Sequence, residues 1–135
     1  MMWRRIYPGR LDQIAQVRSW VRAQCADTER ADDAALIAAE LTSNALLHTR
    51  SGHPGGWFGV ELTRHHDLCL AVHDLGGRTI PAFSTADGQG VLAEHGRGLR
   101  VVAELAAQVG VEGDPVGGHT VWARLTADTS VPCTS

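Results

Sequence analysis

Residues 38–48 read AAELTSNALLH, and this stretch decides how the rest of the chain is interpreted. Glu40 and Asn44 are four residues apart, so a helix places both side chains on one face. Each helical residue turns about 100°, which sets the pair among the apolar side chains of Leu36, Leu47, Ile37 and Leu41. A buried carboxylate is costly unless something pairs with it. The pair therefore predicts either a charged ligand or metal ion, or backbone hydrogen bonds at the edge of the core.

A second acidic residue, Asp74, ends a predicted strand. Residues 68–74 alternate with a period of two, so Asp74 shares a face with the apolar side chains of that strand. Gly76 and Gly77 follow at once. Glycine lets the backbone turn tightly and approach a ligand closely. This segment is therefore a second candidate for ligand binding.

Glycines also precede a third helical pattern. Residues 95–102 read HGRGLRVV, which predicts a helix from Arg97 to about residue 109. A helix that begins after glycines can receive phosphate oxygens at its N-terminus. Residues 76–95 are expected to lack regular structure. A segment that long in a small domain is either a functional lid or an insertion without fixed structure.

The order of these motifs resembles the GHKL ATPase superfamily, which includes gyrase and the sensor histidine kinases. Within it the chain looks most like the small bacterial anti-sigma factor serine kinases. The resemblance covers about residues 3–126. Residues 40–45 match the N box, residues 74–76 the first glycine box, and residues 96–99 the second. The usual first box runs Asp-x-Gly-x-Gly, whereas here the second glycine comes early, at Gly77.

The resemblance implies a Bergerat ATP-binding fold. This is an α/β (α+β) two-layer sandwich, in which a mixed, mostly antiparallel sheet is covered on one face by about three helices. The residue pattern agrees with it. Periodicity predicts strands at 3–7, 57–64, 68–74, 111–112 and 121–126, helices at 11–25, 32–48 and 97–109, and a plain loop at 51–56. We expect one domain over residues 1–128 and a flexible tail over residues 129–135.

The resemblance also implies the residues of an ATP site. Asp74 would accept a hydrogen bond from the adenine amine, and Gly76 would let the base approach the backbone. Asn44 would hold a Mg²⁺ ion that shares the ATP phosphates. Glu40, one helical turn away, would be the general base. The other expected contacts are Gly96, Arg97, Gly98 and Leu99 with the phosphates and Thr120 with the adenine.

The function that the resemblance implies is that of an ATP-dependent serine kinase. Such a protein binds a sigma factor and phosphorylates an antagonist protein, the anti-anti-sigma factor, and the resemblance allows a homodimer. Two alternatives stay open. One is a nucleotide-regulated binding module with little or no kinase activity. The other is a detached catalytic domain of a histidine kinase.

Composition excludes several other classes of protein. The chain has 135 residues, of which 44% are hydrophobic, and a net charge of −3. This balance is globular, and it gives no basic surplus for direct nucleic-acid binding. The sequence contains no apolar run of about 18 residues, the length that would predict a membrane span. The sequence lacks a P-loop, and its one dinucleotide-like glycine pattern, at residues 88–93, does not follow a strand.

The cysteines indicate a reducing, cytoplasmic setting. Cys25, Cys69 and Cys133 are odd in number and lack Cys-x-x-Cys spacing. We expect the first two to be small core residues and Cys133 to be a thiol of the tail.

Overall fold

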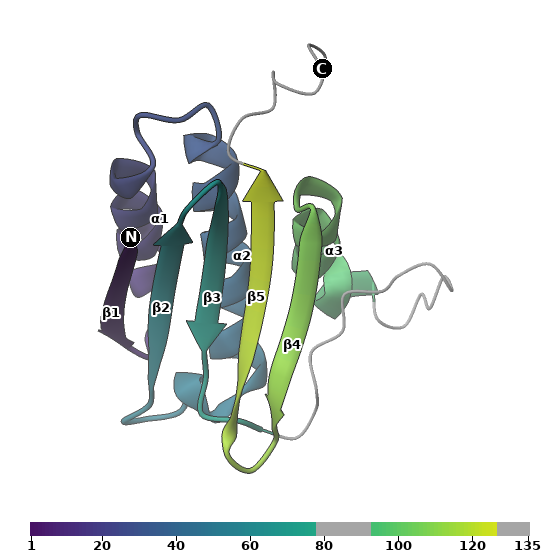
Figure 1. The fold of residues 1–135 in the computed structure, drawn as a ribbon. Coiled ribbons are helices and arrows are strands. Elements are labelled where there is room, and N and C mark those ends of the chain that lie inside the picture. The colour runs from purple at the N-terminus through teal and green to yellow at the C-terminus, as the bar shows by residue number, and fades with distance from the viewer. Residues whose placement is uncertain (78–92, 127–135) are drawn as a thin grey trace.

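The computed structural model describes residues 1–77 and 93–126, and for residues 93–97 the backbone alone. Within these residues three helices lie on one face of a five-stranded sheet (Figure 1). The strands are β1 (Met2–Pro8), β2 (Trp57–Arg64), β3 (Asp67–His73), β4 (Gln108–Asp114) and β5 (Gly118–Thr126). The helices are α1 (Gln13–Gln24), α2 (Ala31–His48) and α3 (Ala93–Leu105), with a short 3-10 helix, η1 (Arg50–Gly52). The expected α+β two-layer sandwich is confirmed.

The sheet is antiparallel throughout, in the order β1-β2-β3-β5-β4. The central strand is β3, which pairs with β5 so that Val72 lies opposite Val121 and His73 opposite Thr120. The end of β3 therefore lies beside the start of β5. The β4–β5 turn and the C-terminal end of α2 are at this same end of the sheet, the lower end in Figure 1.

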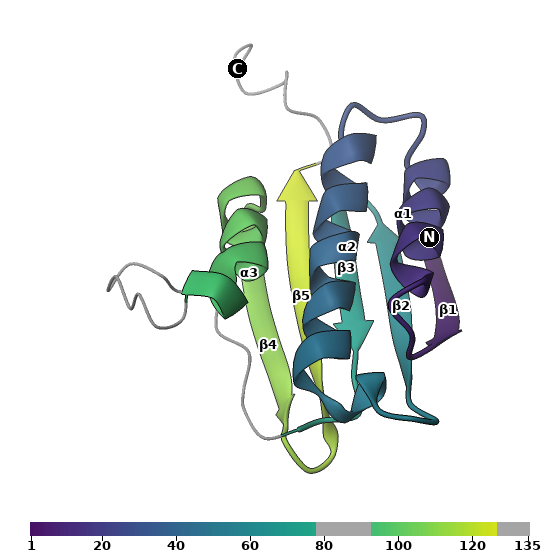
Figure 2. The ribbon, with the colours of Figure 1, turned by 180° about the vertical axis from the view of Figure 1, so that it is seen from behind.

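The core lies between the sheet and the helices. Figure 2 shows the ribbon from the helical side. Strand alternation turns Val60, Leu70 and Val121 toward the helices, and all three are buried. Ile37 and Leu41 of α2 meet them and are fully buried. Burying a side chain of this size contributes about 1.5–3 kcal/mol. Within the described residues the opposite face of the sheet carries no helix, and we call it the open face.

Helix α2 is rotated slightly from the expected orientation. Leu36 and Leu47 are 38% and 60% exposed, so the apolar stripe does not extend to their side of Glu40 and Asn44. The stripe follows small and branched residues on the other side, which pack against the sheet. Asn44 is buried and Glu40 is half-buried. The pair thus lies at the rim of the core, where a ligand can reach it.

Helix α3 begins and ends four residues earlier than the sequence predicts. It starts at Ala93, so Gly96 and Gly98 lie inside the helix instead of opening it. Packing of Leu99 in the core outweighs the helix penalty of about 1 kcal/mol for each glycine. At the other end, the Ala107 amide donates to the Arg124 carbonyl at 2.7 Å, and β4 begins at the next residue.

The cysteine expectations hold in part. Cys25 is fully buried in the core. Cys69 is not a core residue, because the register of β3 turns it onto the open face, where it is half-buried. Burial raises the pKa of both thiols. Cys133 lies outside the described residues.

No helix within residues 1–77 and 93–126 is both long and apolar enough to span a membrane.

Candidate functional site

A buried carboxylate stands at the end of β3. The side chain of Asp74 is 1% exposed, and it lies on the helical side of the sheet with the core residues of the strand. Its Oδ1 atom accepts hydrogen bonds from the backbone amides of Gly76 at 2.7 Å and His119 at 3.0 Å. Its Oδ2 atom is also buried but has no hydrogen-bond partner. An unmade bond of this kind costs about 1–3 kcal/mol, so Oδ2 is an acceptor that awaits a donor.

Gly76 adopts a backbone conformation that few other residues tolerate. Its φ angle is +86°, and a Cβ atom there would overlap the carbonyl of Pro115. The Gly77 amide donates to the same carbonyl at 3.0 Å. The segment after Asp74 therefore runs against the β4–β5 turn with no room for a side chain at Gly76. The two glycines predict a tight turn, and here the atoms that approach Gly76 closely belong to the protein backbone.

Arg50 fixes this segment in place, although no sequence motif marks it as a site residue. Its Nη2 atom donates to the carbonyls of Leu75 at 2.8 Å, Val116 at 3.1 Å and Pro115 at 3.3 Å. Its backbone amide donates to the Gly76 carbonyl at 2.7 Å. One residue of η1, just after α2, thus joins the Asp74 segment to the β4–β5 turn. No local pattern marks such a residue, because its partners lie 25 to 66 positions away.

The segment after α2 is not the plain loop that the sequence predicts. Residues 50–52 form η1, and Ser51 within it is fully buried. Its Oγ atom accepts a hydrogen bond from the Leu75 amide at 3.0 Å. Together with Arg50, Ser51 holds the backbone that follows Asp74.

The β4–β5 turn is itself rigidly built. The Oδ1 atom of Asp114 accepts from the amides of Val116 at 2.9 Å and Gly117 at 2.6 Å, and these bonds lower the pKa of that carboxyl. Gly118 has a φ angle of +107°. A Cβ atom there would overlap the Asp74 carbonyl. The turn therefore positions the first residues of β5 directly against Asp74.

Glu40 contacts the backbone of α3. A Cβ atom added at Gly98 would overlap the Oε1 atom of Glu40 and would lie 3.2 Å from its Cδ atom. Gly98 thus provides the space in which the Glu40 carboxylate lies. Asn44, one turn further along α2, is 8% exposed, and its Nδ2 atom has no hydrogen-bond partner. The structure brings the carboxylate, the amide and α3 to one rim of the core.

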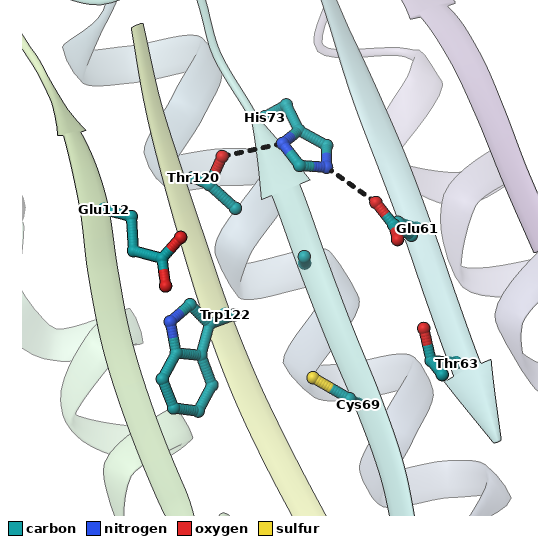
Figure 3. A pocket seen from close by; sticks show the side chains of 8 residues that line it. Glu61, Thr63, Cys69, His73, Glu112, Thr120 and Trp122 are labelled. Atoms are coloured by element: carbon teal, nitrogen blue, oxygen red, sulfur yellow. Dashed lines mark hydrogen bonds and ion pairs between the residues drawn. The ribbon is translucent and has the colours of Figure 1, made fainter. Parts of the chain in front are cut away.

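Thr120 does not join this site, contrary to expectation. Strand β5 turns Val121 and Ala123 into the core, so Thr120 points to the open face. There its Oγ1 atom lies 2.7 Å from His73 Nδ1, while His73 Nε2 lies 3.0 Å from Glu61 Oε1 (Figure 3). The residue of β5 on the same side as Asp74 is His119.

The groove in Figure 3, of about 370 Å³, belongs to the open face as well. Its lining comes from β2, β3, β4 and β5 and includes Cys69 and Trp122. The sheet separates this groove from Asp74, so it does not belong to the candidate site.

The residues expected around the phosphates are only partly in position. Gly98 and Leu99 lie in the second turn of α3, where backbone amides bond within the helix. The Leu99 side chain is buried in the core. Gly96 lies in the first turn of α3, after its first residue, Ala93, and is thus part of the helix. The Arg97 side chain and the expected lid, apart from residues 76–77 and the helical residues 93–95, lie outside the described residues.

Comparison with known proteins decides the family. The sequence pattern of the histidine kinase-like ATPase domain matches residues 7–125, most of the chain. The chain belongs to this family. No curated protein gives a significant match. A histidine kinase-like ATPase domain binds ATP, and the site around Asp74 suits the adenine, because the exocyclic amine would supply the donor that Oδ2 lacks.

Asn44 suits a Mg²⁺ ion that this ATPase domain would share with its nucleotide. An amide oxygen is a hard ligand, and Mg²⁺ keeps waters and substrate phosphates as its other ligands. Within residues 1–77 and 93–126, no cluster of three or more His, Cys, Asp and Glu side chains could hold a metal alone. We therefore expect an ion at Asn44 to bind together with the phosphates.

Asn44→Ala should weaken binding of ATP in the presence of Mg²⁺ several-fold more than binding of ATP with a chelator. The amide acts on the nucleotide through the ion, so without the ion its loss matters little. Calorimetric titrations with and without Mg²⁺ measure both affinities. Equal weakening in the two titrations would show that Asn44 supports α2 and not the ion.

Gly98→Ala should leave the fold intact and lower activity about tenfold or more. Alanine is the better helix former by about 1 kcal/mol, but its Cβ atom would displace the Glu40 carboxylate. A small misplacement of a catalytic group can cost about 100-fold in rate. Thermal unfolding and ATP turnover of the variant measure the two effects. An unchanged turnover would mean that the position of Glu40 is not critical.

Proposed function

We propose that this ATPase domain is a protein serine kinase of the anti-sigma type, which binds a sigma factor and phosphorylates an antagonist protein in the cytoplasm. The observation that carries the proposal is the position of Glu40. Its carboxylate lies at the rim of the core against α3, one helical turn from Asn44. A half-buried acid beside a metal-binding amide is suited to deprotonate a hydroxyl group near the γ-phosphate.

The proposed reaction transfers the γ-phosphoryl group of ATP to a serine. Glu40 takes the proton of the serine hydroxyl as the serine oxygen forms its bond to the γ-phosphorus. The bond from that phosphorus to the β–γ bridging oxygen breaks, and ADP leaves with that oxygen. In phosphoryl transfer the protein mainly positions the reactants and stabilises charge. Glu40 thus orients the nucleophile, and Asp74 holds the adenine at the other end of the nucleotide.

Mg²⁺ bound at Asn44 would neutralise phosphate charge as it develops. Asn44 would keep the ion in register with Glu40, because both side chains project from the same rigid helix. The half-buried setting excludes part of the water that would otherwise screen these charges.

The sigma factor and the antagonist protein enter the proposal through the motif resemblance. The N box and both glycine boxes stand in the order found in anti-sigma factor kinases. The test is direct. The purified protein is incubated with labelled ATP and candidate antagonist proteins, and transfer of label to serine is scored. Label on histidine would instead indicate a histidine kinase, and ATP binding without any transfer would indicate a binding module.

One observation favours the binding module as the second candidate. Because α3 begins at Ala93, the Gly98 amide lies inside the helix and is not free to hold a phosphate. A nucleotide would then set the conformation for a partner without fast transfer. Binding of the sigma factor that depends on ATP, with no labelled serine, would support this reading.

A further inference from the structure

His119 is a buried histidine whose ring has no bonded partner. Its side chain is fully buried, and neither Nδ1 nor Nε2 has a hydrogen-bond partner. Buried polar side chains in proteins are nearly always bonded. A ring with two unsatisfied nitrogens beside a ligand site therefore calls for a functional reason.

The backbone sets His119 directly against Asp74. The Asp74 amide donates to the His119 carbonyl at 2.9 Å, and the His119 amide donates to Asp74 Oδ1 at 3.0 Å. The alternation of β5 turns the His119 ring to the helical side, the side on which the Asp74 carboxylate lies. The two side chains are therefore neighbours on one face of the sheet.

The carboxylate does not need the ring as a partner. His119 Nδ1 lies 3.4 Å from Asp74 Oδ1 but makes no hydrogen bond with it. That oxygen already accepts from two backbone amides, which fills its two lone pairs. The unsatisfied groups are the Oδ2 acceptor of Asp74 and the ring nitrogens of His119, and a neutral imidazole offers one donor.

An acceptor beside a donor matches the edge of adenine. The exocyclic amine of adenine donates, and the adjacent ring nitrogen, N1, accepts. We propose that His119 donates a hydrogen bond to N1 of adenine, beside the bond from the amine to Asp74. Guanine presents the opposite pattern, an oxygen acceptor beside an N–H donor. The pair would therefore reject guanine at both atoms. This inference rests on the proposed nucleotide site and assigns it a second base-reading residue.

Three nucleotides test the assignment atom by atom. They are ATP, 1-deaza-ATP, in which a C–H group replaces N1, and purine riboside triphosphate, which lacks the amine. Calorimetry gives the dissociation constants for the wild type and for His119→Phe, which fills the space without a nitrogen. Asp74→Asn is the matched control, because it alters the contact to the amine alone.

The wild type should bind ATP about tenfold more tightly than 1-deaza-ATP, since an unmade buried bond has a cost of this order. In His119→Phe this preference should vanish, while the preference for ATP over purine riboside triphosphate persists. Asp74→Asn should show the reverse pattern. Equal wild-type affinities for ATP and 1-deaza-ATP, or an unchanged preference in His119→Phe, would overturn the role of His119.

Failure of the nucleotide site itself looks different, because none of the three triphosphates would then bind the wild type. If thermal unfolding shows that His119→Phe does not fold, the test rests on the wild type alone. Its ratio of dissociation constants for 1-deaza-ATP and ATP then decides whether the N1 atom is bound.

Discussion

Glu40→Gln should reduce phosphotransfer about 100-fold or more and change ATP affinity by no more than a few-fold. Glutamine keeps the size of the side chain, so it still fits against Gly98. It cannot take up a proton from the attacking hydroxyl, and general-base catalysis typically contributes about 10²–10⁴-fold. The loss should therefore appear in the rate constant for transfer and not in binding.

Single-turnover transfer of labelled phosphate and calorimetric ATP binding separate these two effects. Glu104→Gln is the matched control, because it makes the same change at an exposed position of α3. It should leave both quantities unaltered. Equal losses of binding and transfer in Glu40→Gln would mean that Glu40 shapes the site without acting as the base. Normal transfer would remove it from the mechanism.

Asp74→Asn should weaken ATP binding about tenfold or more. The asparagine oxygen can still accept from the amides of Gly76 and His119, so the local backbone is preserved. Its amide nitrogen, however, would stand where Oδ2 now lies and would face the adenine amine with a second donor. Leaving a buried hydrogen bond unmade costs about 1–3 kcal/mol. The variant should remain folded while its affinity for ATP falls.

Titrations with ATP and GTP, together with thermal unfolding, measure this effect. Wild-type protein should bind GTP poorly, because guanine carries an oxygen where adenine carries the amine. Asp67→Asn makes the same change at the far end of β3, where the carboxylate pairs with Arg124 at 2.6 Å. This control should retain wild-type ATP affinity. If ATP and GTP bind the wild type equally well, Asp74 does not select the base.

Most of the fold was predictable because its elements bury regular patterns. Phe58, Val60 and Leu62 alternate in β2 and are all fully buried. The predicted bounds of that strand match the structure, since a period of two can be satisfied in only one register when one face is buried. The bounds of α3 were not predictable. Two glycines near its start suggest a helix N-terminus, and only tertiary packing of Leu99 places them inside the helix.

The placement of the candidate site residues was predictable where it follows from the pattern of one segment. Asp74 follows β3 directly and Gly76 lies in the turn after it, as the strand pattern and the glycines predict. Glu40 and Asn44 lie on the same face of α2, as their spacing of four residues predicts. Thr120 was assigned from the family resemblance, although the alternation of the apolar residues after it indicates that His119 faces the core. The part played by Arg50 depends on carbonyl groups from distant segments, which no local pattern encodes.

The pairing of β3 with β5 has a consequence for how the protein assembles. The hairpins β2–β3 and β4–β5 each join strands that are close in sequence, whereas His73 and Thr120 meet across 46 intervening residues. Closing so long a loop carries an entropic penalty and slows folding. Asp74 and His119 come together only where β3 pairs with β5. We therefore expect the binding site to form late in folding, and a bound nucleotide to resist the separation of the two parts of the sheet by mass action.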